Sequence, residues 1–295
     1  MAKFTLRSIG ARVLTSLALL AIVALRPQAG LGQEAKKKGL LGPWQSTAEV
    51  SYVVTGGNTA TSAFSLGTSF TRKWTKDSLL FKAFILNSRS TTTVRTAQGT
   101  ETDFEVNEEK FTRKVAESYL LSGSYDRNIS RKLLGQAGVS WDRNRFAGVD
   151  DRVMVGTGLG YAWIEKPGTR IKTSAGLTYT LRQYVGEAME SFAGFRFSVL
   201  AEKKLRESSS LASSFVFDDN LKKMEDWRFD WTNSVSAAIS KSLALKLSLR
   251  TLYANVPALL TLPLFDPLGE PTNLTVQVPL KNLDMFLTTS LVINF

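Results

Sequence analysis

Residues 281–295 read KNLDMFLTTSLVINF, and this stretch is the clearest indication of the fold. Apolar side chains occupy one parity of it, at Leu283, Met285, Leu287, Leu291, Ile293 and Phe295. The other parity is mostly polar, with Asp284, Thr288, Ser290 and Asn294. A period of two is the pattern of a β-strand with one apolar and one polar face. The sequence therefore predicts an amphipathic final strand that closes on an aromatic residue.

The N-terminal residues indicate export. Three basic residues within the first 12 positions precede an apolar run, 13–25, and Gly30 and Gly32 follow as small residues at the two positions that a signal peptidase reads. The apolar run is too short to cross the roughly 30 Å of hydrocarbon in a bilayer as a helix. We therefore expect three segments: a cleaved signal peptide (1–32), a periplasmic lead segment (33–43) and an outer-membrane β-barrel (44–295).

Alternating segments continue along the whole remaining chain, and we count twelve. They lie at 44–55, 59–73, 78–89, 108–126, 132–146, 151–165, 169–184, 191–206, 209–218, 226–239, 242–255 and 281–295. Each reaches the length of about 9–11 residues that a tilted membrane strand needs. The predicted fold is all-β, a single antiparallel transmembrane β-barrel of about 12 strands; splitting or merging segments would give ten or fourteen.

The connections between these segments are of two kinds. The even-numbered ones are short and polar, whereas two odd-numbered ones, Ser90–Asn107 and Val256–Leu280, are long. Short turns on one rim and longer loops on the other are typical of outer-membrane barrels. We therefore expect both termini and the short turns on the periplasmic side, with the longer loops extracellular. The apolar, proline-rich 256–280 loop has three interpretations: a constriction in the barrel mouth, a partner-binding segment, or a rigid cap on neighbouring loops.

The final strand also resembles the C-terminal signature of bacterial outer-membrane proteins, which makes Phe295 the expected signal for the barrel assembly machinery. Four further stretches resemble the salt-induced outer membrane protein family, a bacterial domain family of unknown function. They are VSY at 50–52 leading into GGNT at 56–59, WDRNRF at 141–146, Arg152 with GTGLGY at 156–161, and GLTY at 176–179. The similarity runs from about Trp44 to Phe295. It implies an outer-membrane barrel with no established catalytic or ligand-binding residues.

Composition excludes several functions. The net charge of +11 comes from interleaved bases and acids, which favours contact with anionic lipopolysaccharide or small solutes rather than nucleic acid. The chain has no cysteine, so no disulfide supports the fold, and no histidine. Ser-His and Cys-His nucleophilic sites and histidine-ligated metals are therefore excluded. A Ser-Lys dyad is left open, but no pair stands out. We expect no catalytic residue, no cofactor and no metal.

Two motifs have structural interpretations. The glycines of Gly156-x-Gly158-x-Gly160 are not a nucleotide-binding fingerprint, because no helix follows. We expect them to face the lumen and let the strand coil. Acidic residues at 150–151, 218–219 and 225–226 leave a surface calcium site open, although solvated acids on a rim are the simpler interpretation.

The polar parity of the strands defines the expected lumen. The candidate lumen-lining charges are Lys82, Lys172, Arg182, Arg196, Arg228, Asp230, Lys246, Arg250 and Asp284. Glu49, Asp142 and Glu202 share this face. Paired ladders that fill a narrow lumen are the favoured interpretation, and the mild excess of bases leaves slight anion selectivity open.

The expected function is that of a non-enzymatic outer-membrane barrel: a narrow pore, or an envelope-integrity protein linked to salt stress through the family resemblance. The alternative is an adhesion or ligand-binding barrel that presents its long loops, and an enzyme is disfavoured by the absent histidine. The expected partners are outer-membrane lipid and lipopolysaccharide, the assembly machinery and small solutes, but no nucleic acid.

Overall fold

A computed structural model describes residues 43–295 except 56–58, 100–103, 266–267 and 269. The expected signal peptide and almost all of the expected lead segment lie outside the described residues. In the part of the chain that is described, no helix is long and apolar enough to cross a membrane. The described residues belong to one compact unit, which carries all the elements below.

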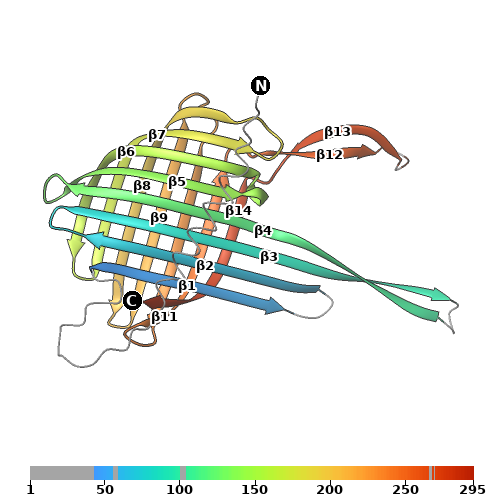
Figure 1. Cartoon of the computed structure of the whole chain (residues 1–295), viewed down its shortest axis with the longest axis horizontal. Helices are drawn as coiled ribbons and strands as arrows, with labels where there is room; N and C mark the ends of the chain where they lie inside the picture. The colour runs from blue at the N-terminus through green and yellow to red at the C-terminus, as the bar shows by residue number, and fades with distance from the viewer. Residues whose placement is uncertain (1–42, 56–58, 100–103, 266–267, 269) are drawn as a thin grey trace, which may run out of the picture. The chain divides into compact units, whose positions relative to one another are not determined.

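Twelve antiparallel strands form a closed barrel (Figure 1). They are β1 (Trp44–Thr55), β2 (Thr59–Lys73), β3 (Asp77–Gly99), β4 (Phe104–Asn128), β5 (Leu133–Asn144), β6 (Val149–Lys166), β7 (Thr169–Tyr184), β8 (Glu190–Arg206), β9 (Ser209–Asn220), β10 (Arg228–Ala238), β11 (Leu243–Ala254) and β14 (Leu283–Asn294). Each strand pairs with its neighbours in the chain, and β14 closes the ring between β11 and β1. The predicted all-β fold and strand number are confirmed.

The two faces of the wall follow the alternation of the sequence. In β6, the apolar side chains of Val155, Leu159 and Trp163 are exposed on the outer face, whereas Met154 and Ala162 are buried on the inner face. An outer apolar face suits lipid, and a closed ladder satisfies backbone groups without water. The molecule therefore has the architecture of a transmembrane β-barrel.

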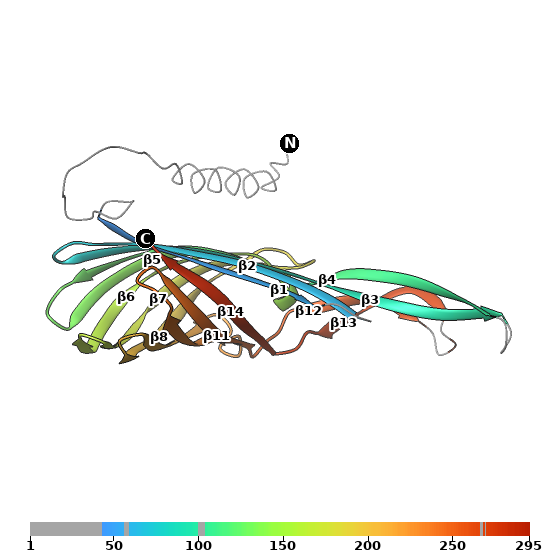
Figure 2. The same cartoon turned by 90° about the horizontal axis from the view of Figure 1, so that it is seen from below.

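Glycines on the inner face shape one side of the wall. Gly158 pairs with Gly176 across β6 and β7, and a Cβ on Gly158 would lie 2.7 Å from the Cα of Gly176. Such a close approach is available only where both residues lack side chains. The wall turns through β5, β6, β7 and β8 at this side of the barrel (Figure 2).

The prediction of a loop over Ser90–Asn107 was wrong. β3 continues to Gly99 and β4 begins at Phe104, so the two strands extend as a ribbon past the point where β2 stops pairing with β3, at Thr92. The ribbon contains a polar cross-strand contact that joins Asn107 Nδ2 to Gln98 Oε1 at 3.5 Å. Its sequence is rich in threonine and charged residues, so it lacks the apolar alternation by which the other strands were predicted.

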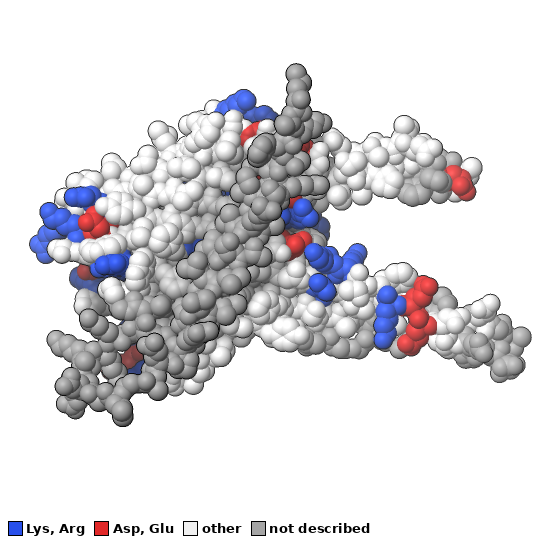
Figure 3. Space-filling model, in the orientation of Figure 1, with Lys and Arg blue, Asp and Glu red and all other residues white. Residues whose placement is uncertain are grey.

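The long 256–280 connection also contains strands. β12 (Leu259–Phe265) pairs with β13 (Pro271–Pro279) in a separate two-stranded hairpin. Neither strand contains a charged residue, and this projection is largely white in Figure 3 except near its tip. The hairpin and the β3–β4 ribbon belong to the same rim, called here the long-loop rim, and the opposite rim carries the short turns.

Candidate functional site: a charged lumen and its mouth

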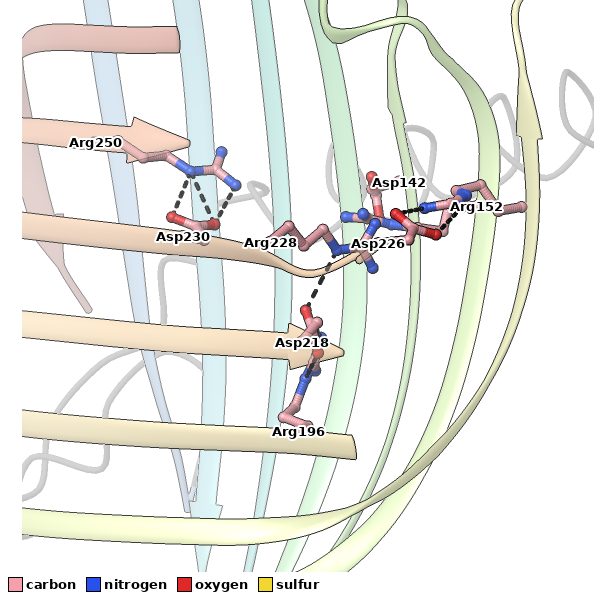
Figure 4. A network of polar contacts seen from close by, with 9 residues as sticks. Asp142, Arg152, Arg196, Asp218, Asp226, Arg228, Asp230 and Arg250 are labelled. Atoms are coloured by element: carbon pink, nitrogen blue, oxygen red, sulfur yellow. Dashed lines mark hydrogen bonds and ion pairs between the residues drawn. The ribbon is translucent and has the colours of Figure 1, made fainter. Parts of the chain in front are cut away.

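Ion pairs between neighbouring strands line the inner face of the barrel (Figure 4). Three of them have short N–O distances: Arg152 to Asp142 at 2.7 Å, Arg196 to Asp218 at 2.6 Å, and Arg250 to Asp230 at 2.6 Å. Arg228 adds a longer contact of 3.6 Å to Asp218. Because strand pairing fixes the register, each base lies opposite or diagonal to its acid, as cross-strand pairs require.

Two further ion pairs reach over intervening strands. The Lys172 ammonium on β7 lies 2.8 Å from Asp126 on β4, and Gln136 on β5 donates to the same carboxylate at 3.0 Å. The Lys246 ammonium on β11 lies 2.8 Å from Glu49 on β1, with β14 between them. These contacts join the inner wall laterally over several strands.

Seven of the nine predicted lumen charges therefore have an ion-pair partner: Lys172, Arg182, Arg196, Arg228, Asp230, Lys246 and Arg250. Within the described part of the chain, Lys82 and Asp284 have no opposite charge within the 4.0 Å limit of an ion pair. The prediction missed Asp126, Glu190 and Asp218 as inner-wall acids. These three acids have the same inward parity as the predicted charges, and they lie close to strand ends; the parity alone could have identified them.

The most buried charge of this array is Arg182, whose side chain is only 4% exposed. Its guanidinium lies 2.5 Å from Asp226 and 2.5 Å from Glu190, and Asn220 donates to Asp226 at 2.8 Å. Charge-assisted hydrogen bonds of this kind offset the cost of burying the charges. Since Asp226 belongs to the β9–β10 connection, the pair holds that connection down at the long-loop rim.

Four of the six acids considered for calcium, Asp150, Asp151, Asp218 and Asp226, form ion pairs with arginines instead. Asp150 accepts from Arg145 at 2.8 Å, and this hydrogen bond raises the pKa of Arg145. Asp218 and Asp226 belong to the ion pairs above. Among the described residues, no three metal-ligating side chains converge.

A segment called here the strap crosses the mouth at the long-loop rim. It consists of residues 255–258 and 280–282, which join β11 and β14 to the β12–β13 hairpin. Ala258 is 4% exposed and packs against Gly148, in the turn between β5 and β6, so closely that a Cβ on Gly148 would clash with it. In the closed strand order, β5 and β6 lie opposite β11 and β14. The strap must therefore pass over the mouth to make this contact.

Hydrogen bonds hold the strap in place. The Leu280 amide donates to the Ala258 carbonyl at 2.9 Å. The Asn255 side chain donates to the Glu225 carbonyl at 2.8 Å, and Asn282 donates to the Ala254 carbonyl at 2.8 Å. The base of the 256–280 segment thus crosses the mouth, while its hairpin projects from the rim.

The chain belongs to the family described as a protein of unknown function, DUF481, whose model matches residues 48–259. No curated protein matches the sequence. The barrel is similar to solved outer-membrane structures at low identity. The NanC porin is 8% identical with a TM-score of 0.45, and the alignment covers 84% of this chain and 98% of that one.

An outer membrane channel from Pseudomonas putida F1 is 9% identical with a TM-score of 0.43, covering 91% of this chain and 100% of that one. An anion-selective porin from Comamonas acidovorans is 11% identical with a TM-score of 0.37, covering 85% and 99%. Similarity at this level concerns the barrel architecture and carries no inference about solutes.

Proposed function

We propose that this protein is a non-enzymatic outer-membrane pore with a narrow, charged lumen for small solutes. The observation that carries the proposal is the inner wall itself, which presents ion pairs from β1 and β4–β11 rather than an apolar core. They include the Arg182 cluster, which consists of Arg182, Glu190, Asp226 and Asn220. A soluble barrel of this size would place apolar side chains inside and polar ones outside, which is the reverse arrangement.

The outer membrane is the proposed location, with residues 1–32 removed as a signal peptide. The exposed apolar outer face supports a lipid environment, and a closed barrel satisfies its backbone groups in hydrocarbon through its strand pairing. In this proposal the barrel contacts lipid and lipopolysaccharide, and the final strand with Phe295 is read by the assembly machinery. The short-turn rim then faces the periplasm and the long-loop rim the outside.

The strap makes the pore a restricted one. It covers part of the mouth, and the Arg182–Asp226 pair draws the β9–β10 connection toward the inner wall. Restricted passage agrees with a role in envelope integrity under salt stress, which the family resemblance suggested. It does not agree with a general porin, whose mouth must admit solutes freely.

Single-channel conductance of the purified protein in planar bilayers tests this proposal. We expect small, stable current steps, because ions must pass a charged lumen and a strapped mouth. A large open conductance would instead indicate a general porin. A silent bilayer, with heat-modifiable migration proving a folded barrel, would contradict the pore.

A second candidate, adhesion or ligand binding through the long-loop rim, is favoured by the β12–β13 hairpin. Its strands expose Leu260, Leu262, Leu264, Leu274, Val276 and Val278. Exposed apolar surfaces of this kind often mark interaction sites. Replacing 259–279 by a short polar turn should abolish capture of a partner while the barrel stays folded, and unchanged capture would contradict this candidate.

A further inference from the structure

The seam between β1 and β14 is much shorter than the other seams of the barrel. The two strands pair only from Thr47–Asn294 to Val50–Leu291. On their other sides, β1 pairs with β2 along its whole length and β14 pairs with β11 from Leu283 to Ile293. Figure 2 shows β14 leaving β1 toward the long-loop rim. The continuous wall therefore ends at the Val50–Leu291 pair.

Outward side chains next to this divergence are largely exposed. On the outer face, Tyr52 and Leu287 are each 69% exposed and Met285 is 65% exposed. A residue in a paired wall is flanked by a strand on both sides, whereas these residues have a neighbour on one side only. Their exposure agrees with the short seam, although Leu177, which is paired on both sides, reaches a similar 62%.

Two apolar side chains lie on the inner side of the divergence, on the same parity as the polar Thr288 and Asp284 of β14. Val53 lies on the inward parity of β1, yet it is 46% exposed. Phe286 lies on the inward parity of β14, because it pairs with the inward Arg250. Neither side chain can enter the ion-pair array. An apolar chain reaching the lumen between β1 and β14 would meet these two side chains first.

Unpaired strand edges are costly in hydrocarbon, and membrane proteins tolerate them where they border a polar interior or a path to it. The mouth directly above this divergence is crossed by the strap, which rests on Gly148. The strap therefore restricts the passage of molecules along the barrel axis. Passage through the wall is least restricted at the same place, because β1 and β14 do not pair there. We infer that the wedge between β1 and β14 is a lateral portal that admits the acyl chain of an amphiphile between the lumen and the bilayer.

Paired cysteines test whether the seam stops at Val50–Leu291, and the chain has no native cysteine to interfere. Continuing the observed register would place Val53 opposite Thr288, whereas Thr47 and Asn294 pair in the structure. All four residues lie on the inward parity, which makes Thr47→Cys with Asn294→Cys the matched control. Oxidation in phosphatidylcholine vesicles should link the control pair, while Val53→Cys with Thr288→Cys should link only through a long bis-maleimide.

Nitroxide labels test whether acyl chains enter. A label on Phe286→Cys should be relaxed by lipid-soluble oxygen several-fold more than by a water-soluble nickel complex. The control is Phe84→Cys, an inward aromatic position on β3 that is flanked by Gly67 and Leu120, and its label should favour the nickel complex. Heat-modifiable migration shows that each variant is a folded barrel.

Three results would overturn the portal. One is a Val53–Thr288 disulfide that forms as readily as the control. Another is equal accessibility at positions 286 and 84. The third is a disulfide between two copies of the chain, because a second copy would then cover the edge. None of these measurements requires ion flow, so a silent bilayer counts against the proposed pore and leaves the portal standing.

Discussion

Ala258 packs against Gly148, although the strands that lead to these two residues lie on opposite sides of the barrel. Both residues are buried. Gly148 also has a positive φ of 76° at the end of the short turn 145–147, a conformation that favours glycine. The strap thus contacts the β5–β6 turn through two small residues, Ala258 and Gly148, and neither position leaves room for a larger side chain.

Displacing the strap should widen the pore. Ala258→Glu places a charge where only a methyl group fits, and an unpaired charge cannot remain buried. We expect the strap to leave Gly148 and single-channel conductance to rise. The matched control is Leu274→Glu on β13, an exposed position of the same connection, which adds the same charge away from the mouth. Equal conductance in Ala258→Glu and the unmodified protein would show that the strap does not limit current.

The Arg182 cluster should contribute strongly to stability. Arg182→Met removes the guanidinium from Asp226, which is 8% exposed, and from Glu190. Leaving a buried acid without its partner typically costs about 3–5 kcal/mol. We expect a loss of this size in the free energy of unfolding, measured by urea titration of the barrel in vesicles. Adding Asp226→Asn should recover part of it, because the second substitution removes the stranded charge.

Arg170 and Glu202 provide the comparison for that experiment. They form an ion pair of 2.9 Å between the same two strands that carry Arg182 and Glu190, but both side chains are about 40% exposed. Pairs in contact with water contribute about 1 kcal/mol or less. Arg170→Met should therefore change stability little, and equal losses in the two variants would contradict the argument from burial.

The barrel wall could be predicted because alternation is a local property. Leu177 and Tyr179 face outward and Thr178 inward whatever strands pair beside them, so the parity of one segment was enough. The contacts that shape the site are not local. Arg182 meets Asp226 across 44 positions, and Ala258 meets Gly148 only because the chain crosses the mouth. Likewise, the alternation within β1 or β14 does not predict how many of their residues pair with each other.

Inner glycines should be required where β6 meets β7. Gly158→Ala would place a methyl group 2.7 Å from the Gly176 Cα and closer still to the Ala175 carbonyl oxygen. Backbone cannot yield as a flexible side chain can, so overpacking should cost about 1–3 kcal/mol. Gly67→Ala is the control, since its methyl group would make ordinary contacts of 3.6 Å and 3.7 Å. A urea titration in which both variants lose equal stability would disprove the close-approach argument.

Lys82 should govern the ion selectivity of the proposed pore. It is an exposed inward base on β3, and within the described residues it has no carboxylate at ion-pair distance. A base neutralised by a partner attracts no mobile anion, whereas an uncompensated ammonium does. Lys82→Gln should therefore lower the anion-to-cation permeability ratio, read from the reversal potential across a potassium chloride gradient.

Lys76→Gln, in the short turn between β2 and β3, removes the same charge outside the lumen and should leave the ratio unchanged. Raising the salt on both sides should shrink the difference between Lys82→Gln and the unmodified protein, because screening weakens the field of a charge in contact with water. If both substitutions shift the reversal potential equally, selectivity arises from the overall positive charge of the protein, and Lys82 has no special part in it.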